Sequence, residues 1–162
     1  MIDPRSKSLA AIISLLAFVL VACAATTQVS VQPIKVGGIA MDPTLKKGDR
    51  ILISKDTGEL RRGDIVTYHY PADESQSFIS RIIGLPNEEI EVREGKVLVN
   101  GEYLEESYVN PDDNRSLFSR KPLKIPEDSY FVMGDNRDHS NDSRFWGALQ
   151  KKFIYGKFIK KY

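Results

Sequence analysis

The sequence predicts a mainly β domain of antiparallel sheets, preceded by one N-terminal helix that attaches it to a membrane. Three observations lead to this prediction. Residues 9–25 form an apolar run, the rest of the chain alternates apolar and polar residues over short stretches, and turn-forming residues separate these stretches. At 162 residues the chain has room for one domain with its own core plus a short appendage.

The N-terminal segment combines a basic lead with an apolar run that contains no charge. Arg5 and Lys7 lie in the lead, and only Ser14 interrupts the apolar residues 9–25. A run of this length is at the lower limit for crossing a hydrocarbon core of about 30 Å. Because the basic residues precede the run, we expect the N-terminus in the cytoplasm and the remainder beyond the membrane. Residues 1–28 are therefore a membrane anchor or signal segment, and residues 29–162 an extracytoplasmic domain on a single-pass protein of the cytoplasmic (inner) membrane.

Cys23 offers a second interpretation of the same segment. The tetrapeptide that ends at this residue, LVAC, is similar to the lipobox of bacterial lipoproteins. In such proteins the cysteine is lipidated and becomes the new N-terminus. A plain anchor is favoured, and a lipoprotein attached through Cys23 remains open. Either form keeps the domain on the lipid bilayer.

Short alternating stretches predict the strands of the domain. They comprise residues 29–31, 50–53, 64–68, 90–92 and 96–99. Turn signals separate them at residues 47–49, 62–64 and 85–87 and at the Asn-Gly pair of residues 100–101. The polar, turn-rich residues 105–124 are expected to form an excursion over the surface.

Composition excludes several classes of function. A formal net charge of +1, with 23 basic and 22 acidic side chains, gives no concentrated positive field for nucleic acid. A single cysteine excludes an internal disulfide and a cysteine-based zinc site. The aspartates of residues 134–144 lack the central glycine and terminal glutamate of an EF-hand, so no metal site is expected.

Four segments, in order, resemble the signature of type I signal peptidases. They are residues 32–45 (QPIKVGGIAMDPTL), 62–66 (RGDIV), 79–86 (ISRIIGLP) and 134–147 (GDNRDHSNDSRFWG), of which the last is the most specific. The resemblance covers about residues 32–162. It implies antiparallel sheets held on the outer face of a cytoplasmic membrane, an activity that removes signal peptides from exported proteins, and no metal or cofactor. In that family a serine attacks the peptide and a buried, neutral lysine accepts its proton.

The two positions that correspond to this catalytic dyad are substituted. Ala40, directly before Met41, occupies the nucleophile position and offers no lone pair for attack. Ser80, directly before Arg81, occupies the position of the general base, and a hydroxyl does not act as a base near neutral pH. An engineered trap would explain one alanine, but the second substitution favours natural loss. No shift of the alignment restores a serine and a lysine.

The resemblance also assigns supporting and binding roles. Ser140 would lie beside the base, and Asp142 with Arg144 would form an ion pair that stiffens the site, although these charges more simply tie their own loop down. Gly38 stands where some members carry a hydroxyl in the oxyanion hole, while the backbone N–H of Ala40 remains available as a donor. The expected contacts with a bound peptide are Gly38, Ile39, Met41, Pro43, Ile79 and Arg81.

The two histidines have separate expected places. His69 follows the Gly-Asp turn of residues 63–64 and is expected on the surface or at a strand edge. His139 lies within the last motif, at a position that is often asparagine, and could approach the cleft. With alanine at position 40, it would have no serine to activate.

Two functions remain as hypotheses. The chain is either a non-cleaving relative that binds signal peptides or other extended export segments, or an active signal peptidase with an unrecognised catalytic arrangement. Peptides of this kind bind by strand addition, which needs only backbone donors and acceptors. Binding can therefore persist after the dyad is lost, and the non-cleaving role is favoured.

Overall fold

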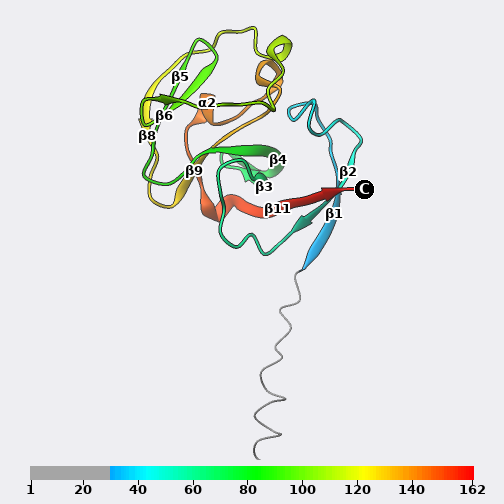
Figure 1. The fold of residues 1–162 in the computed structure, drawn as a ribbon. Helices are drawn as coiled ribbons and strands as arrows, with labels where there is room; N and C mark the ends of the chain where they lie inside the picture. Colours follow the sequence, from blue (N-terminus) through cyan, green and yellow to red (C-terminus); the bar gives the residue numbers. More distant parts are fainter. Residues whose placement is uncertain (1–29) are drawn as a thin grey trace, which may run out of the picture.

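The computed structural model describes residues 30–162, and these form two antiparallel sheets (Figure 1). The seven-stranded sheet has the order β1-β2-β11-β3-β4-β9-β10, and the four-stranded sheet has the order β7-β6-β5-β8. The mainly β, antiparallel prediction is confirmed. The expected anchor helix, the alternative at Cys23 and the boundary at residue 28 lie outside the described residues. Within residues 30–162 no helix has the length and apolar character needed to cross a membrane.

The strands are short except for two. Their bounds are β1 Val31–Lys35, β2 Arg50–Ser54, β3 Ile65–Tyr70, β4 Asp73–Gly84, β5 Glu89–Arg93, β6 Lys96–Val99, β7 Glu102–Tyr103, β8 Arg120–Lys124, β9 Ser129–Met133, β10 Leu149–Gln150 and β11 Ile154–Lys161. The helical elements are single turns: η1 Pro111–Asp113, η2 Arg137–His139, α2 Ser143–Trp146 and η3 Lys151–Phe153.

Strand β4 is the central feature of the large sheet. It pairs with β3 along nearly its whole length, from Arg81 opposite Ile65 to Asp73 opposite Tyr70. On its other side β9 pairs only with the segment that begins at Arg81. The first part of β4, residues 73–80, therefore has a strand partner on one side only.

Three apolar clusters hold the sheets together. One lies on one face of the large sheet and contains Tyr68, Ile82 and Val132. A second lies between the large and small sheets and contains Ile83, Ile90 and Phe131. The third packs the turn after β1 against β2 and β3. At roughly 25 cal/mol for each Å² of apolar area removed from water, such clusters supply the main favourable term in folding.

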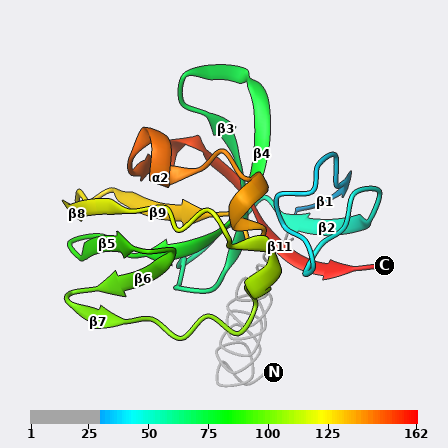
Figure 2. The same cartoon turned by 90° about the horizontal axis from the view of Figure 1, so that it is seen from above.

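The expected strands were found, but the pattern missed others. The stretches at 50–53, 64–68, 90–92 and 96–99 correspond to β2, β3, β5 and β6, while the one at 29–31 overlaps β1 only at its end. The alternation does not predict β8–β11, and β4 is indicated only by the resemblance of residues 79–86 to the family's motif. The excursion at 105–124 has no regular structure beyond η1 until β8 begins at Arg120. Seen from above, β1 and β2 lie on the opposite side of the β3–β4 pair from the small sheet (Figure 2).

Candidate functional site

A cleft of about 600 Å³ lies along the part of β4 that has β3 as its only strand partner. Residues 34–40 form one wall, residues 77–80 of β4 form the other, and residues 139–141 close one end, with Thr67 and Tyr155 also in the lining. Six of the residues expected at the site line this single cleft: Gly38, Ile39, Ala40, Ile79, Ser80 and Ser140. The structure thus brings Ala40 and Ser80, the two positions that the resemblance assigns to the dyad, to one place.

Ala40 is held by its backbone. Its carbonyl oxygen accepts a hydrogen bond of 3.0 Å from the N–H of Asn136, which joins the turn to the loop of the last motif. This approach requires a glycine at position 134, because a Cβ there would lie 2.5 Å from the Ala40 oxygen and 2.3 Å from the hydroxyl of Ser140. The methyl group of Ala40 supplies no nucleophile, but the hydrogen bond from Asn136 holds the backbone of Ala40 against residues 134–136.

Ser80 is almost fully buried, with 2% of its surface exposed. It lies opposite Val66 in the β3–β4 pair. Its hydroxyl is 3.1 Å from the hydroxyl of Tyr68, and either group can donate. Burial raises the pKa of Tyr68 well above its ordinary value, and the hydrogen bond with Ser80 only partly opposes this rise. Both hydroxyls stay protonated near neutral pH, so this pair offers no general base.

The loop after β9 is built on a buried ion pair between Asp142 and Arg144. Arg144 donates from Nε to Oδ1 of Asp142 at 2.8 Å and from Nη2 to Oδ2 at 2.9 Å. Asp142 also accepts from the backbone N–H of Gly134 at 3.0 Å and caps α2 through the N–H of Arg144. Arg144 donates further to the carbonyl of Arg137 at 2.6 Å. Every one of these groups is buried, so the network fixes the loop that carries Ser140.

Three of the expected peptide contacts lie outside the cleft lining among the described residues. Met41 is fully buried in the cluster under β1 and β2. Pro43 is exposed in the turn that follows. Arg81 forms a two-bond ion pair with Asp135, at 2.9 Å from Nε to Oδ1 and 2.6 Å from Nη2 to Oδ2, and stacks over the ring of Tyr108 at 4.1 Å.

Asp135 joins the segments that form the walls of the cleft. Besides Arg81 on β4, it accepts a hydrogen bond of 2.5 Å from the hydroxyl of Thr44 in the turn after Ala40. Its side chain has no exposed surface. Residue type and spacing placed Asp135 only among the charges of its own loop, because these partners lie 54 and 91 positions away in the sequence.

The surface excursion is also tied to the motif loop. Arg137, which is buried, donates two hydrogen bonds to the carboxylate of Glu106, at 3.0 and 2.6 Å. Asp138 accepts from the backbone N–H groups of Arg115 and Ser116 at 2.8 and 3.0 Å. These contacts hold the pKa of Asp138 below its ordinary 3.8, with the hydrogen bond from Arg115 as the largest cause. The excursion therefore supports the loop that closes one end of the cleft.

The two histidines differ in their surroundings. His69 stacks on Tyr155 with ring centres 4.7 Å apart, and its Nδ1 is buried without a partner among residues 30–162. His139 lines the cleft itself, with Nδ1 3.1 Å from Oδ1 of Asn136. Across residues 30–162, no three or more His, Cys, Asp and Glu side chains group in a way that could hold a metal ion.

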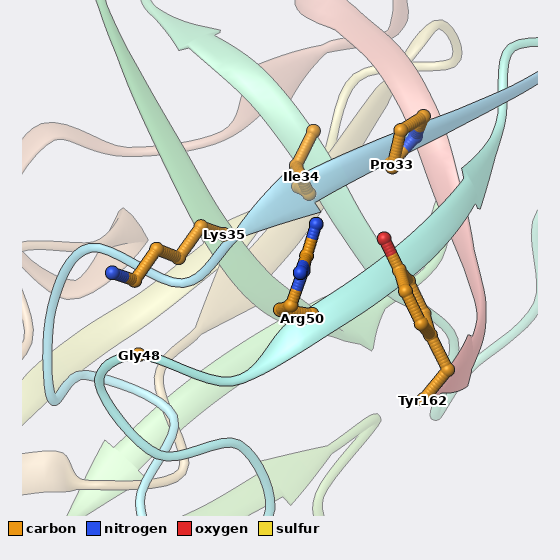
Figure 3. A pocket seen from close by; sticks show the side chains of 6 residues that line it. All are labelled: Pro33, Ile34, Lys35, Gly48, Arg50 and Tyr162. Carbon is orange, nitrogen blue, oxygen red and sulfur yellow. The ribbon is translucent and has the colours of Figure 1, made fainter.

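A second hollow, of about 470 Å³, lies along β1 and shares Ile34 and Lys35 with the cleft. The guanidinium of Arg50 lies 5.6 Å from the centre of the Tyr162 ring. Figure 3 shows these two side chains side by side, with their polar ends turned toward β1. This contact joins β2 to the residue that follows β11, so it belongs to the edge of the large sheet.

Comparisons with known proteins agree with these motifs. Residues 8–162 match the family model described as signal peptidase, peptidase S26. The chain is 38% identical over 135 residues to a signal peptidase I of Leptolyngbya laminosa, covering 76% of this chain and 64% of that protein. It is 34% identical over 145 residues to signal peptidase IB of Staphylococcus aureus, covering 78% of this chain and 75% of that protein.

A crystal structure of a signal peptidase I from Enterococcus faecalis is similar in fold as well as sequence. The TM-score is 0.53 and the identity 32%, over 64% of this chain and 98% of that one. The chain spans less than two thirds of the length of the Leptolyngbya protein, at 64%, and of a probable signal peptidase I-2 of Synechocystis, at 59%. From the family match and these identities, the chain belongs to the signal peptidase (peptidase S26) family.

Proposed function

We propose that this protein binds signal peptides, or similar extended segments of exported proteins, without cleaving them. Residues 1–28 would attach it to the cytoplasmic membrane, as an anchor or through lipidated Cys23, and residues 29–162 would lie on the outer face. One observation carries the proposal: a single cleft is lined by both positions that the resemblance assigns to the dyad, and these hold Ala40 and a Ser80 whose hydroxyl is bonded to Tyr68.

Strand addition is the proposed mode of binding. Residues 77–80 line the cleft, and β4 has no second strand partner there. An extended peptide laid along this edge would exchange main-chain hydrogen bonds with it, and shallow pockets would accept its small side chains. Gly38, Ile39 and Ile79 would contact the peptide directly. Met41 and Arg81 would support the walls from behind, and Pro43 would shape the turn.

The proposed protein does not cleave the bound peptide, because it lacks both the nucleophile and the general base that cleavage requires. A neutral serine paired with tyrosine accepts no proton from a nucleophile, and a methyl group attacks nothing. The backbone N–H at position 40 is unchanged by the substitution and would still donate to a peptide carbonyl. Such a donor, without a nucleophile, stabilises bound peptide and provides only a small part of the usual rate.

The test compares the full-length protein, in detergent, with three variants: Ala40→Ser, Ser80→Lys and the pair. Each is incubated with a preprotein whose signal peptide ends in the small-x-small pattern, and the product is quantified. We expect no measurable cleavage by the unmodified protein or either single variant. The pair should gain far more than the sum of the singles, because a nucleophile and its base act as one unit. Burial beside Tyr68 and Phe78 would favour the neutral form of the introduced lysine.

Binding is measured in parallel on the unmodified protein. A fluorescent peptide with the small-x-small ending should bind, and a control peptide with leucine at both small positions should bind much more weakly. Ordinary turnover by the unmodified protein would instead establish the alternative, an active signal peptidase with another nucleophile. Failure to bind either peptide would refute the proposal as a whole.

The membrane location has its own test. Protease added to intact spheroplasts should digest residues 29–162, and protection of the domain would contradict the proposed orientation. Metabolic labelling with palmitate, compared with a Cys23→Ser variant, separates lipidation from a plain anchor. Loss of residues 1–22 from the mature mass together with label would favour the lipoprotein form.

A further inference from the structure

His139 is the one aromatic nitrogen base in the cleft lining among residues 30–162. It ends the single turn η2, directly before Ser140, and is exposed. Neither the dyad positions nor the buried ion pairs use it. Its ring therefore offers the cleft a polar group that the proposed binding mode has not yet included.

One hydrogen bond, to Asn136, orients this ring. Its Nδ1 is 3.1 Å from Oδ1 of Asn136, and the N–H of the same Asn136 donates to the carbonyl of Ala40. Asn136 itself is buried, with 4% of its surface exposed. An amide oxygen has no hydrogen to give, so Nδ1 is the donor in this bond. In the neutral imidazole the proton then resides on Nδ1, and Nε2 carries a free lone pair.

The bond to Asn136 is the only hydrogen bond of the ring within residues 30–162. The neighbouring carboxylate, Asp138, is already occupied by the backbone N–H groups of Arg115 and Ser116. Across the cleft, the hydroxyl of Ser80 is engaged with Tyr68. The acceptor at Nε2 is thus held in place without a partner in the described part of the chain.

We propose that Nε2 of His139 accepts a hydrogen bond from a backbone N–H of the bound peptide and so determines part of its affinity. The proposal rests on the proposed function and names a binding residue for it. An extended strand presents outward N–H groups at every second residue, and a peptide in the cleft that Ala40 and residues 139–141 line together would bring one such group to His139. One neutral hydrogen bond contributes about twofold to tenfold to an affinity.

Two substitutions test the acceptor atom Nε2 of His139 separately from the bond between Nδ1 and Asn136. His139→Asn keeps an amide near the position of Nδ1, where it can still bond to Asn136, and removes the group at Nε2. His139→Gln places an amide near the position of Nε2. The full-length protein and both variants are titrated with the fluorescent small-x-small peptide and with a series of the same peptide, each N-methylated at one residue, which removes one N–H donor.

We expect His139→Asn to bind the parent peptide about twofold to tenfold more weakly, with His139→Gln recovering much of the loss. One N-methylated peptide should lose affinity for the unmodified protein but not for His139→Asn, which identifies the donor by a double-mutant cycle. Peptide binding should also shift the ¹⁵N resonance of Nε2 in the unmodified protein. Urea unfolding of each variant, followed by Trp146 fluorescence, checks that the fold is unchanged.

Equal affinity of the unmodified protein and His139→Asn for the parent peptide overturns the inference and leaves the proposed function intact. The same holds if every N-methylated peptide loses affinity equally for both proteins. If the unmodified protein binds no peptide at all, this inference and the proposed function are both wrong.

Discussion

Removing the carboxylate of Asp142 should lower the free energy of unfolding more than the removal of any surface charge does. Asp142 accepts four hydrogen bonds: from the N–H groups of Gly134 and Arg144 and from two nitrogens of the Arg144 guanidinium. The side chains of Asp142 and Arg144 have 0% and 2% exposure. Asp142→Ala leaves a buried guanidinium without its counter-charge, and breaking such a pair costs about 3–5 kcal/mol.

Asp142→Asn removes the negative charge but keeps the shape of the side chain. The amide keeps one acceptor oxygen and the side-chain volume, so we expect a smaller loss, of roughly 1.5–3 kcal/mol. The assay is urea unfolding followed by the fluorescence of Trp146, which is the only tryptophan and packs 6.0 Å from the rings of Tyr68 and Tyr70. The slope of the free energy of unfolding against urea should not change if only stability is altered.

Glu59→Ala is the matched control. Its ion pair with Arg61 is also two residues apart in the sequence, but the two side chains are 77% and 75% exposed. Exposed pairs contribute little, so this variant should remain within about 0.5 kcal/mol of the unmodified protein. If Asp142→Ala also loses less than about 1 kcal/mol, the loop is not held by this network and the reasoning fails.

Two further predictions concern the same loop. Gly134→Ala should cost about 1–3 kcal/mol in urea unfolding, because its Cβ would lie 2.5 Å from the Ala40 oxygen, whereas Gly37→Ala, with nothing within 4 Å, should be nearly neutral. Because the pKa of Asp138 is lowered, its stabilising contribution is complete above the ordinary 3.8 and is lost as pH falls through the lowered value. The protection of the Arg115 amide, relative to its exchange rate in the unfolded chain at the same pH, should therefore fall in acid, and Asp138→Asn should show low protection already at pH 6; equal protection in the variant would contradict this.

Sequence patterns found the strands that alternate cleanly and missed those that do not. Residues 50–53 and 90–92 alternate fully buried residues with more exposed ones, which gives the period of two. Strand β4 begins with five exposed residues and ends with Ile82, Ile83 and Gly84, all of them buried, so no single period describes it. All five residues of β9 are buried, which removes the polar half of the signal.

The motifs singled out the residues of the candidate site, but they did not reveal the side-chain contacts among them. Positions 40 and 80, which the motif strings singled out, both line the same cleft. The motifs could not show that Arg81 pairs with Asp135 or that Glu106 reaches Arg137, because side-chain partners separated by 54 and 31 residues leave no local pattern. For the same reason no local pattern indicated that Tyr68 lies against Ser80.

The order of strands in the large sheet affects when the cleft can exist. Strand β11 is the last along the chain, yet it lies between β2 and β3 and pairs with both. Until residues 154–161 arrive, the β1–β2 hairpin and the β3–β4 pair are separate pieces of sheet, and each carries one wall of the cleft. Non-local pairing of this kind forms late, because loop closure must precede it. During folding, the two walls would therefore be tied together by Asp135 and the loop after β9 before β11 joins them into one sheet.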